Sequence, residues 1–312
     1  MAQDFRQIKG IPALHDNLTK WIVHSVAVVP IKTIHAYRAN TFRLLPGKQL
    51  KSLEEAVEFV NERGFIFFWP IKDILMPSLW TAVAGDRPVA DEHDDPGHVT
   101  WGWKDAQLGK DLWYYAKILR KRATMIAMDI APYFYALTEN YGSPEEDYLT
   151  TYEQGRMTQE AKTVYEVLLD EGPLDTISLR RKSHLTSRES DSRFNKALTD
   201  LQTDFKVVPV GVTDAGAWHY AFAYDITARH YPEISERARF IGEKEARRKL
   251  VELYFRSVGI AKVNDVTKLF RWRPKNTEEA LESLVQAGSL KASLKIEKRK
   301  GDWYGISDII KS

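Results

Sequence analysis

The chain has 312 residues, a hydrophobic fraction of 44%, a formal net charge of +2 at pH 7 and no cysteine. Without cysteine it cannot form disulfides, cysteine-ligated zinc sites or iron–sulfur clusters. Its apolar runs are too short to cross a bilayer, and its first residues have no signal-peptide pattern. We therefore expect a cytoplasmic protein of two or three domains with no membrane contact.

The N-terminal region, residues 1–157, begins its regular pattern at Ser52. This residue caps a predicted helix, with Glu55 three residues later as in a capping box, and the helix ends at Gly64. The aromatic run 65–71 predicts a strand or a turn. Glycine, proline and acidic residues over 84–100 predict a long loop, and a further helix is expected over 113–128.

Part of that loop, Asp91 to His98, is the chain's only cluster of metal-ligand residue types. Carboxylates and imidazoles bind divalent ions when several of them converge on one point. Consecutive side chains in a flexible run point in different directions, so we interpret the segment as a turn or a solvated acidic loop. We expect no metal and no cofactor.

Three tryptophans are candidates for stacking on a nucleic-acid base. Trp101 and Trp103 are two residues apart, which would place both on one face of a strand, and Trp69 belongs to the aromatic run. Indoles in such positions can stack on a base that has left the duplex. Core packing is the alternative role for all three.

Residues 158–232 predict a winged-helix unit, with three helices and a two-stranded hairpin. The helices are one that ends at Gly172-Pro173, a basic one from Leu174 to Leu185, and one that begins after Ser187. Ile177 and Leu179 should face inward on the second helix. The apolar period then changes to two, which predicts a hairpin over 208–224.

Residues 233–312 repeat the same plan. Apolar stripes predict helices that end at Gly259, near Phe270 and at Gly288, and alternating residues then predict a strand up to a basic turn at Lys300-Gly301-Asp302. The fold class expected is mainly α with small β-hairpin wings (α+β). It would consist of tandem winged-helix (helix-turn-helix) domains, three if the N-terminal region holds a degenerate copy.

Charge is distributed unevenly along the chain. Residues 237–300 contain 17 Lys and Arg against 8 Asp and Glu, whereas residues 139–175 contain 2 against 10. A local positive face attracts a duplex and an acidic one repels it, so this segregation would orient DNA on the surface. A solvated acidic linker is the alternative interpretation of the second stretch.

The segment from Glu245 to Gly259, followed by Asn264-Asp265-Val266 and Phe270-Arg271-Trp272, resembles the third winged helix of the AlkZ/YcaQ-type DNA glycosylases. The unit over 158–224 resembles their middle winged helix. The resemblance covers most of the chain from Ser52 onward. It implies three winged helices around a DNA channel and the removal of alkylated or crosslinked bases.

The chain departs from that family's pattern at one place. The resemblance implies a Gly-x-x-Gln-x-Gln or Gln-x-Asp stretch that positions the water attacking the sugar C1′. Alignment on Gly64 and Pro70 instead places Phe67 and Trp69 at the two polar positions. Phe has no polar atom and an indole only donates, so neither can accept a proton. If another carboxylate has taken the role, the candidates are Asp73, Asp91 and Asp105.

Candidate DNA contacts follow from winged-helix geometry. A recognition helix enters the major groove by its N-terminal end, and the wing meets the backbone or the minor groove. In the first unit the candidates are Arg188, Arg193, Asn195 and Lys196. In the second they are Lys275, Asn276, Lys298, Arg299 and Lys300.

Three functions stay open from the sequence. The first is a monomeric protein that binds double-stranded DNA, including damaged DNA, without the usual glycosylase motif. The second is an active DNA glycosylase with a relocated catalytic carboxylate. The third is a winged-helix transcription regulator, since a fold does not fix a function.

Overall fold

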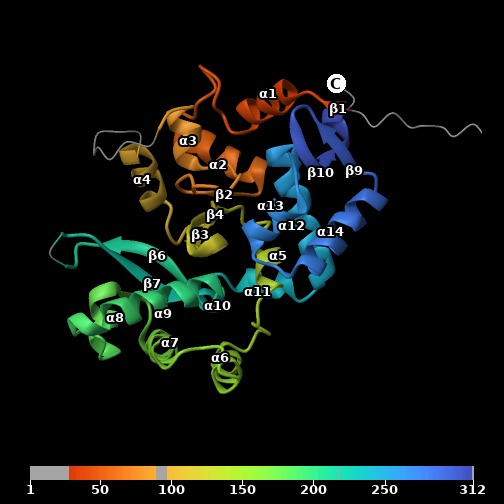
Figure 1. Ribbon diagram of the computed structural model, residues 1–312. Coiled ribbons are helices and arrows are strands. Elements are labelled where there is room, and N and C mark those ends of the chain that lie inside the picture. The colour runs from red at the N-terminus through yellow and green to blue at the C-terminus, as the bar shows by residue number, and fades with distance from the viewer. Residues whose placement is uncertain (1–27, 89–96, 217, 311–312) are drawn as a thin grey trace, which may run out of the picture.

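The computed structural model describes residues 28–88, 97–216 and 218–310. Helices predominate, and three small sheets lie among them (Figure 1). This mixed architecture confirms the expected α+β class. Among the described residues, no helix is both long and apolar enough to span a membrane.

The first sheet is built on the aromatic run after Gly64. Its strand order is β2-β4-β3, from β2 (Phe65–Phe67), β3 (Tyr114–Lys117) and β4 (Ala123–Ile126). The helix α2 (Leu53–Arg63) leads into it, and Ser52 Oγ accepts a hydrogen bond from the Glu55 amide at 3.3 Å, as predicted. The Glu55 carboxylate accepts the amide of Lys51, one residue before the position that a capping box requires.

The helix expected over 113–128 is wrong, because this stretch forms the antiparallel hairpin β3–β4. Met125 in its second strand pairs with Tyr115 on one side and with Ile66 of β2 on the other. Apolar residues are so dense here that they fit both the helical period of about 3.6 residues and the strand period of two. The local pattern therefore does not distinguish a helix from a strand. The neighbouring strand β2 decides it.

The strand expected to carry Trp101 and Trp103 is also wrong, because both lie on the helix α4 (Gly97–Ala106), next to α3 (Leu79–Ala84). Two residues correspond to about 200° around a helix, so the two indoles point apart. The buried positions of α4 are Thr100 and Lys104, and Gln107 and Leu108 are buried just after its end. The buried face of this helix is therefore polar, and for this reason the spacing of apolar residues does not reveal the helix.

The middle part of the chain contains the predicted helices and hairpin. Its elements are α5 (Ala131–Tyr135), α6 (Pro144–Glu153), α7 (Gln159–Glu171), β5 (Leu174–Asp175), α8 (Thr176–Lys182), the 3-10 turn η2 (Arg188–Ser190), α9 (Asp191–Thr203), β6 (Val207–Thr213) and β7 (Ala221–Ile226). The expected burial of Ile177 is wrong, since it is 50% exposed, whereas Leu179 is fully buried. Helix α8 is shorter than predicted, and it presents only Leu179 to the core.

The last part repeats three helices and a hairpin. Its elements are α10 (Thr227–His230), α11 (Pro232–Ala238), α12 (Glu243–Val258), β8 (Ile260–Ala261), α13 (Val263–Phe270), α14 (Pro274–Gln286), β9 (Leu290–Ile296), β10 (Arg299–Ile306) and the 3-10 turn η3 (Ser307–Ile310). The turn predicted at Lys300-Gly301-Asp302 is wrong. The chain turns at Glu297-Lys298, and the predicted residues lie in β10, where the register shifts between Arg299 and Trp303.

The start of the described chain packs on this last part. Strand β1 (Val28–Val29) pairs in parallel with β9, at the edge of a sheet of order β1-β9-β10-β8. From the helix α1 (Ile31–Thr41), Arg38 donates to the carbonyls of Val258 and Ile260 at 3.0 and 2.7 Å. The first contact satisfies a carbonyl at the end of α12 that has no partner within the helix, and the second joins α1 to β8.

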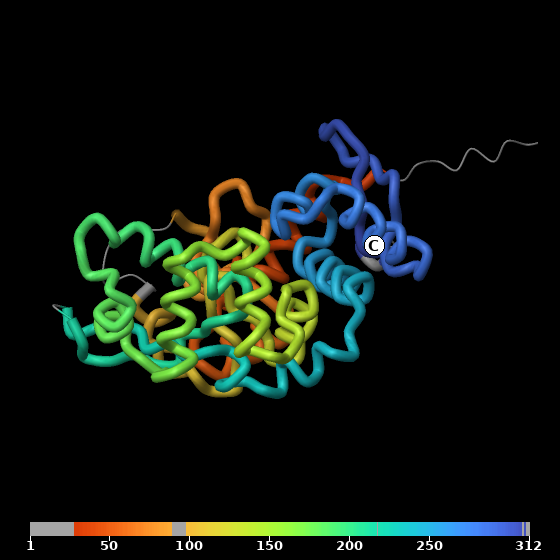
Figure 2. Tube along the Cα trace, turned by 90° about the horizontal axis from the view of Figure 1, so that it is seen from below, coloured from red at the N-terminus to blue at the C-terminus, as the bar shows by residue number. Residues whose placement is uncertain are grey.

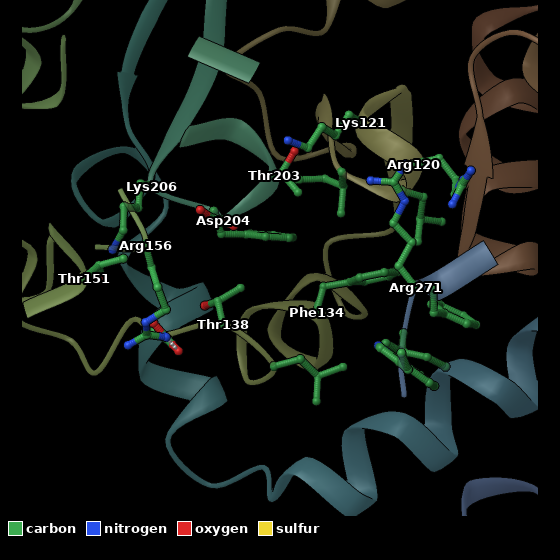
Figure 3. Close-up of a pocket in the computed structure, with 18 residues that line it drawn as sticks. Arg120, Lys121, Phe134, Thr138, Thr151, Arg156, Thr203, Asp204, Lys206 and Arg271 are labelled. Carbon is green, nitrogen blue, oxygen red and sulfur yellow. Dashed lines mark ion pairs between the residues drawn. The ribbon is translucent and has the colours of Figure 1, made fainter. Parts of the chain in front are cut away.

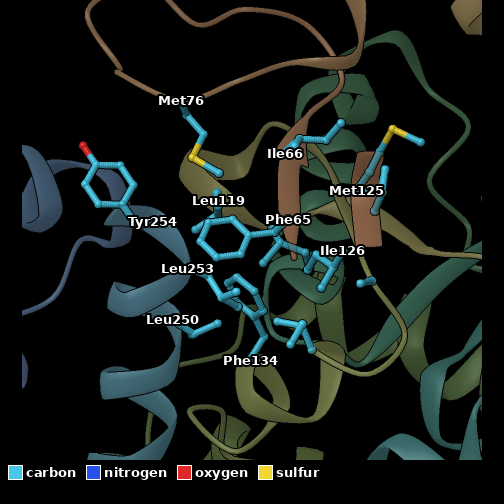
Figure 4. Packing of buried hydrophobic residues seen from close by; sticks show 14 of the residues in the cluster. Phe65, Ile66, Met76, Leu119, Met125, Ile126, Phe134, Leu250, Leu253 and Tyr254 are labelled. Atoms are coloured by element: carbon cyan, nitrogen blue, oxygen red, sulfur yellow. The ribbon is translucent and has the colours of Figure 1, made fainter. Parts of the chain in front are cut away.

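One apolar core joins the parts. It includes Phe65 of β2, Phe134 of α5, and Leu250 and Leu253 of α12 (Figure 4). Phe205, which follows α9, belongs to the same core. The middle part also has a core of its own between α7, α9 and the sheet β5-β7-β6. Seen from below, the middle and last parts extend to opposite sides of this shared core (Figure 2). The core therefore fixes the segments that meet in the site described next.

Candidate nucleic-acid interface

A central pocket of about 430 Å³ lies where the β3–β4 loop meets the C-terminal ends of α9 and α13 (Figure 3). Its apolar lining includes Phe134, Phe205, Leu250, Phe270 and Trp272. Its charged lining consists of the cations Arg120, Lys121, Arg156, Lys206 and Arg271 and the carboxylates Glu139 and Asp204. Aromatic and cationic residues thus share one concave surface.

Three of these cations occupy backbone positions that favour glycine. Arg120 and Lys121 have φ values of 58° and are the central residues of a turn closed by the Arg122 amide and the Leu119 carbonyl at 3.0 Å. Arg271 caps the C-terminus of α13 with φ 59°. A residue with a side chain in this left-handed region costs about 1–2 kcal/mol. Such strain is concentrated at functional sites.

The pocket cations differ in whether they have an anionic partner. Lys121 pairs with Asp200, and Arg156 pairs with Glu139. Within the part of the chain that the structure describes, Arg120 and Arg271 form no ion pair. Desolvation and the charge of Arg271 lower the pKa of the Arg120 guanidinium. Two neighbouring cations without a counter-ion create a local positive potential on this side of the pocket.

On the other side, Lys206 is only 4% exposed, and its Nζ donates to Asn140 Oδ1 at 2.7 Å. Desolvation lowers the pKa of Lys206, although the charges of Asp147 and Asp204 oppose this. Desolvation also raises the pKa of Asp204, against the effect of Lys206. The charge of each group thus opposes the shift that burial causes in the other, and Asp204 keeps an exposed surface.

A second cationic feature, the Lys104 cage, joins α4 to β7. Lys104 is 1% exposed, and its Nζ lies 4.5 Å from the ring centroid of Phe222 and 4.6 Å from that of Trp101. It also pairs with Asp105 at 2.5 Å and donates to Tyr220 Oη at 3.0 Å. Desolvation lowers the pKa of Lys104, while the hydrogen bond to Asp105 opposes the shift. Cation–π contacts stabilise a buried ammonium in such a cage.

The residues aligned with the family's polar motif lie in two environments. Phe67 is fully buried in β2 and pairs with Thr124 of β4. Trp69 is half-buried, with its ring centroid 5.9 Å from that of Trp80. Neither residue lines the central pocket. The side chain of Phe67 belongs to the core.

The three candidate carboxylates are not brought together. Asp73 is exposed, and its backbone carbonyl accepts the Lys268 ammonium at 2.7 Å. Asp105 is held by Lys104 and Tyr220, and Asp91 lies outside the described residues. The carboxylates that do line the pocket are Glu139, which pairs with Arg156, and Asp204, which the sequence does not distinguish from other carboxylates that follow a helix.

Comparison with known proteins identifies the family. The model of a family described as AlkZ related matches residues 50–271. The chain belongs to the AlkZ-related family. The solved structure of the Streptomyces sahachiroi DNA glycosylase AlkZ is similar to this AlkZ-related chain, with a TM-score of 0.57 and 14% sequence identity, over 90% of this chain and 71% of that one. No curated protein sequence matches.

In this AlkZ-related fold, two of the three candidate stacking residues lie around one ring. The centroid of Phe68 is 5.5 Å from that of Trp69 and 5.9 Å from that of Trp101. Trp101 is 43% exposed and its Nε1 donates to Tyr220 Oη at 2.9 Å. Within the described chain, Trp103 forms no ring contact with Phe68, and both Trp69 and Trp103 pack against the shared core.

The candidate DNA contacts of the first unit lie on η2 and α9. Arg188 and Asn195 are exposed, whereas Arg193 pairs with Glu160 at 3.1 Å and Lys196 pairs with Asp200 at 2.5 Å. Ion pairing of this kind reduces the charge available to a phosphate. Arg188 is therefore the least engaged cation of this group.

The candidates of the second unit lie at the start of α14 and on the hairpin β9–β10. Lys275 and Lys298 are each 85% exposed at their side chains, Arg299 and Lys300 are also exposed, and Asn276 is half-buried. The helix α9 and this hairpin lie at opposite ends of the molecule in both views (Figures 1 and 2). The structure does not bring the two groups together.

Proposed function

We propose that this AlkZ-related chain binds double-stranded DNA, including damaged DNA, without the water-positioning chemistry that the family resemblance implies. The lack of water-positioning chemistry is inferred from Phe67, which is fully buried where the resemblance implies a glutamine. A buried apolar side chain can neither bind nor orient a water molecule. The similar solved structure is named as a DNA glycosylase, which supports DNA as the partner.

The proposal includes winged-helix modules over 158–232 and 233–312, with a degenerate third in residues 1–157. The order α7-α8-α9-β6-β7 supports the first module, and α12-α13-α14-β9-β10 supports the second. Exposed cations on the hairpin β9–β10 are suited to the backbone of a duplex. The central pocket lies between these modules.

Duplex binding is tested by a salt titration with a fluorescent oligonucleotide. If lysines and arginines neutralise phosphates, the logarithm of the association constant falls linearly with the logarithm of salt concentration, with a slope of about −0.9 per phosphate contact. Incubation with alkylated duplex should leave the bases in place. Affinity that is absent at low salt, or that does not change with salt, would contradict DNA binding through phosphates.

A second candidate function, glycosylase activity with a relocated carboxylate, is favoured by Asp204. Desolvation raises the pKa of this pocket carboxyl, which makes it a stronger base than an ordinary aspartate. As a base it would take a proton from water while the water oxygen bonds to C1′. The glycosidic bond would break, and its electron pair would leave with the cationic alkylated base.

Base release separates the two candidates. Duplexes that contain N7- or N3-alkylated purines are incubated with the wild type and with Asp204→Asn, and abasic sites are then measured. Release by the wild type that Asp204→Asn abolishes supports the second candidate. The absence of release from all such duplexes removes it and leaves DNA binding as the function.

A further inference from the structure

We propose that the central pocket is a nucleotide-binding site, in which Arg120 and Arg271 hold the phosphate of one nucleotide of a DNA strand and Phe270 and Trp272 form the wall for its base. This proposal rests on the proposed DNA binding, and it assigns one nucleotide of the bound DNA to the central pocket. The sequence candidates for DNA contact include none of these four residues.

The backbone around the two arginines supports a dedicated anion site. Arg120 lies in the β3–β4 turn and Arg271 caps α13, both in left-handed conformations where glycine or asparagine is ordinarily favoured. Lys121, beside Arg120, has the same conformation and lines the same pocket. Left-handed residues other than glycine also occur away from the pocket, at Arg43 and Ser293 for example, so the support comes from three left-handed cations that line one pocket.

The charge balance of the pocket points to an anionic ligand. Among the described residues Arg120 and Arg271 have no ion pair, and the buried Lys206 donates to the neutral Asn140. Desolvation lowers the pKa of Arg120, and the nearby positive charge of Arg271 lowers it further. Guanidinium groups bind phosphate oxygens in a bidentate manner, and a phosphate would supply the negative charge that this side of the pocket lacks.

The shape and lining of the pocket limit what can carry that phosphate. A volume of about 430 Å³ falls in the range of small-molecule sites and excludes a base pair with its backbone. The rings of Phe270 and Trp272 stack on each other, with centroids 4.3 Å apart and planes 12° apart. Because their inner faces cover each other, a base would stack on an outer face of this pair, as single unpaired bases do on other aromatic rings. One nucleotide that has left the duplex therefore fits best.

The test uses variants that keep the backbone conformation and remove the charge. Asparagine adopts left-handed conformations readily, so R120N/R271N should fold with an unchanged or higher melting temperature. The matched control is R122N/R273N. It changes two exposed arginines, each two residues further along the chain, that do not line the pocket.

Binding of deoxyadenosine 5′-monophosphate, deoxyadenosine and inorganic phosphate to the full chain is measured by isothermal titration calorimetry. We expect the monophosphate to bind the wild type at least tenfold more tightly than either of the other two probes. R120N/R271N should lose at least tenfold in affinity for the monophosphate, and the control should change less than twofold. No binding of the monophosphate, or an equal loss in the control, overturns the proposal. Equal affinity for inorganic phosphate overturns the nucleotide assignment.

The salt titration of duplex binding distinguishes failure of this proposal from failure of the proposed function. Duplex binding without monophosphate binding removes the pocket assignment alone. Monophosphate binding without duplex binding keeps the pocket and removes the duplex as the partner.

Discussion

Gly259 ends α12 with φ 76°, and a Cβ at this position would lie 2.7 Å from Tyr37 Cδ1 and 3.0 Å from Ile309 Cδ1. Gly288 has φ 74° with open space around it, so the two glycines separate the backbone cost from the steric cost. We expect Gly288→Ala to destabilise by about 1 kcal/mol and Gly259→Ala by about 3 kcal/mol, because overlap adds to the left-handed conformation. Urea unfolding measures both, and equal effects would contradict the packing of α1 on Gly259.

Phe67 and Trp69 should respond differently to a polar residue. Phe67→Gln places an amide in the dry core between β2 and the helices, which we expect to cost about 4 kcal/mol or more. Trp69→Gln should cost about half as much, since Trp69 is half-buried and the new amide can reach water. The measurement is the free energy of unfolding in urea. A Phe67→Gln variant as stable as the wild type would show that this position is open to a water molecule.

The residues of the central pocket could not be predicted from the sequence. Arg120, Asp204 and Arg271 come from three distant segments and have no common spacing, so only the tertiary structure assembles them. The left-handed conformations of the two arginines also have no signal in the sequence, because arginine does not mark such positions as glycine does. The burial of Phe194 and Leu201, in contrast, follows from their helical spacing, and the structure confirms it. Phe205 is buried as well, but it lies beyond the end of α9 with φ 54° and joins the shared core.

At the scale of elements, prediction succeeded where an apolar stripe is local and continuous. The helices α7, α9, α12 and α14 each bury such a stripe. It failed for the hairpin β3–β4, which depends on pairing with β2, and for α4, whose buried face is polar. It also misplaced the last turn, because Gly301, with φ 109°, lies in the irregular part of β10.

The corrected turn gives a prediction for the hairpin β9–β10. Lys298 lies in the turn and Arg299 and Lys300 follow it, all exposed. Replacing all three with alanine should weaken duplex binding by roughly tenfold or more, equally for all sequences. The salt dependence should become less steep by about 0.9 for each phosphate that the variant no longer neutralises. Fluorescence anisotropy at several salt concentrations measures this.

The control for that prediction is a triple alanine variant of Lys48, Lys51 and Lys110, which are exposed elsewhere on the molecule. It removes the same charge from other surfaces. An equal loss of affinity in the two variants would indicate a general charge effect and would contradict a role for the hairpin.

At the scale of the whole molecule, the shared core buries many tyrosines and makes the fold sensitive to alkali. Burial raises the pKa of Tyr135 to about 12, and it also raises the pKa values of Tyr114, Tyr231 and Tyr254. Above pH 10 the unfolded chain loses these protons while the folded chain keeps them. Stability present below pH 10 is therefore lost as the pH rises, by up to about 1.4 kcal/mol per pH unit for each tyrosine.

Lys104 works in the opposite direction, because its lowered pKa makes the folded state bind fewer protons than the unfolded state until both are neutral. Lys206 and Lys117, whose pKa values desolvation also lowers, act in the same direction as Lys104, and the larger number of buried tyrosines outweighs these three lysines. We expect the urea midpoint to fall steeply from pH 10 to pH 11, with tyrosine absorbance changing in the same transition. A midpoint that stays constant over this range would contradict the burial of the phenols.

The parallel pairing of Val28 and Val29 with Lys295 and Ile296 has a consequence for the order of folding. During synthesis the edge of β9 does not exist until residue 296 has been added. The helix α1, whose Arg38 bonds to the end of α12, likewise waits for a partner more than 200 residues away. Such distant contacts form slowly because a long loop must close first. The first described segment of the polypeptide should therefore be among the last to reach its final place.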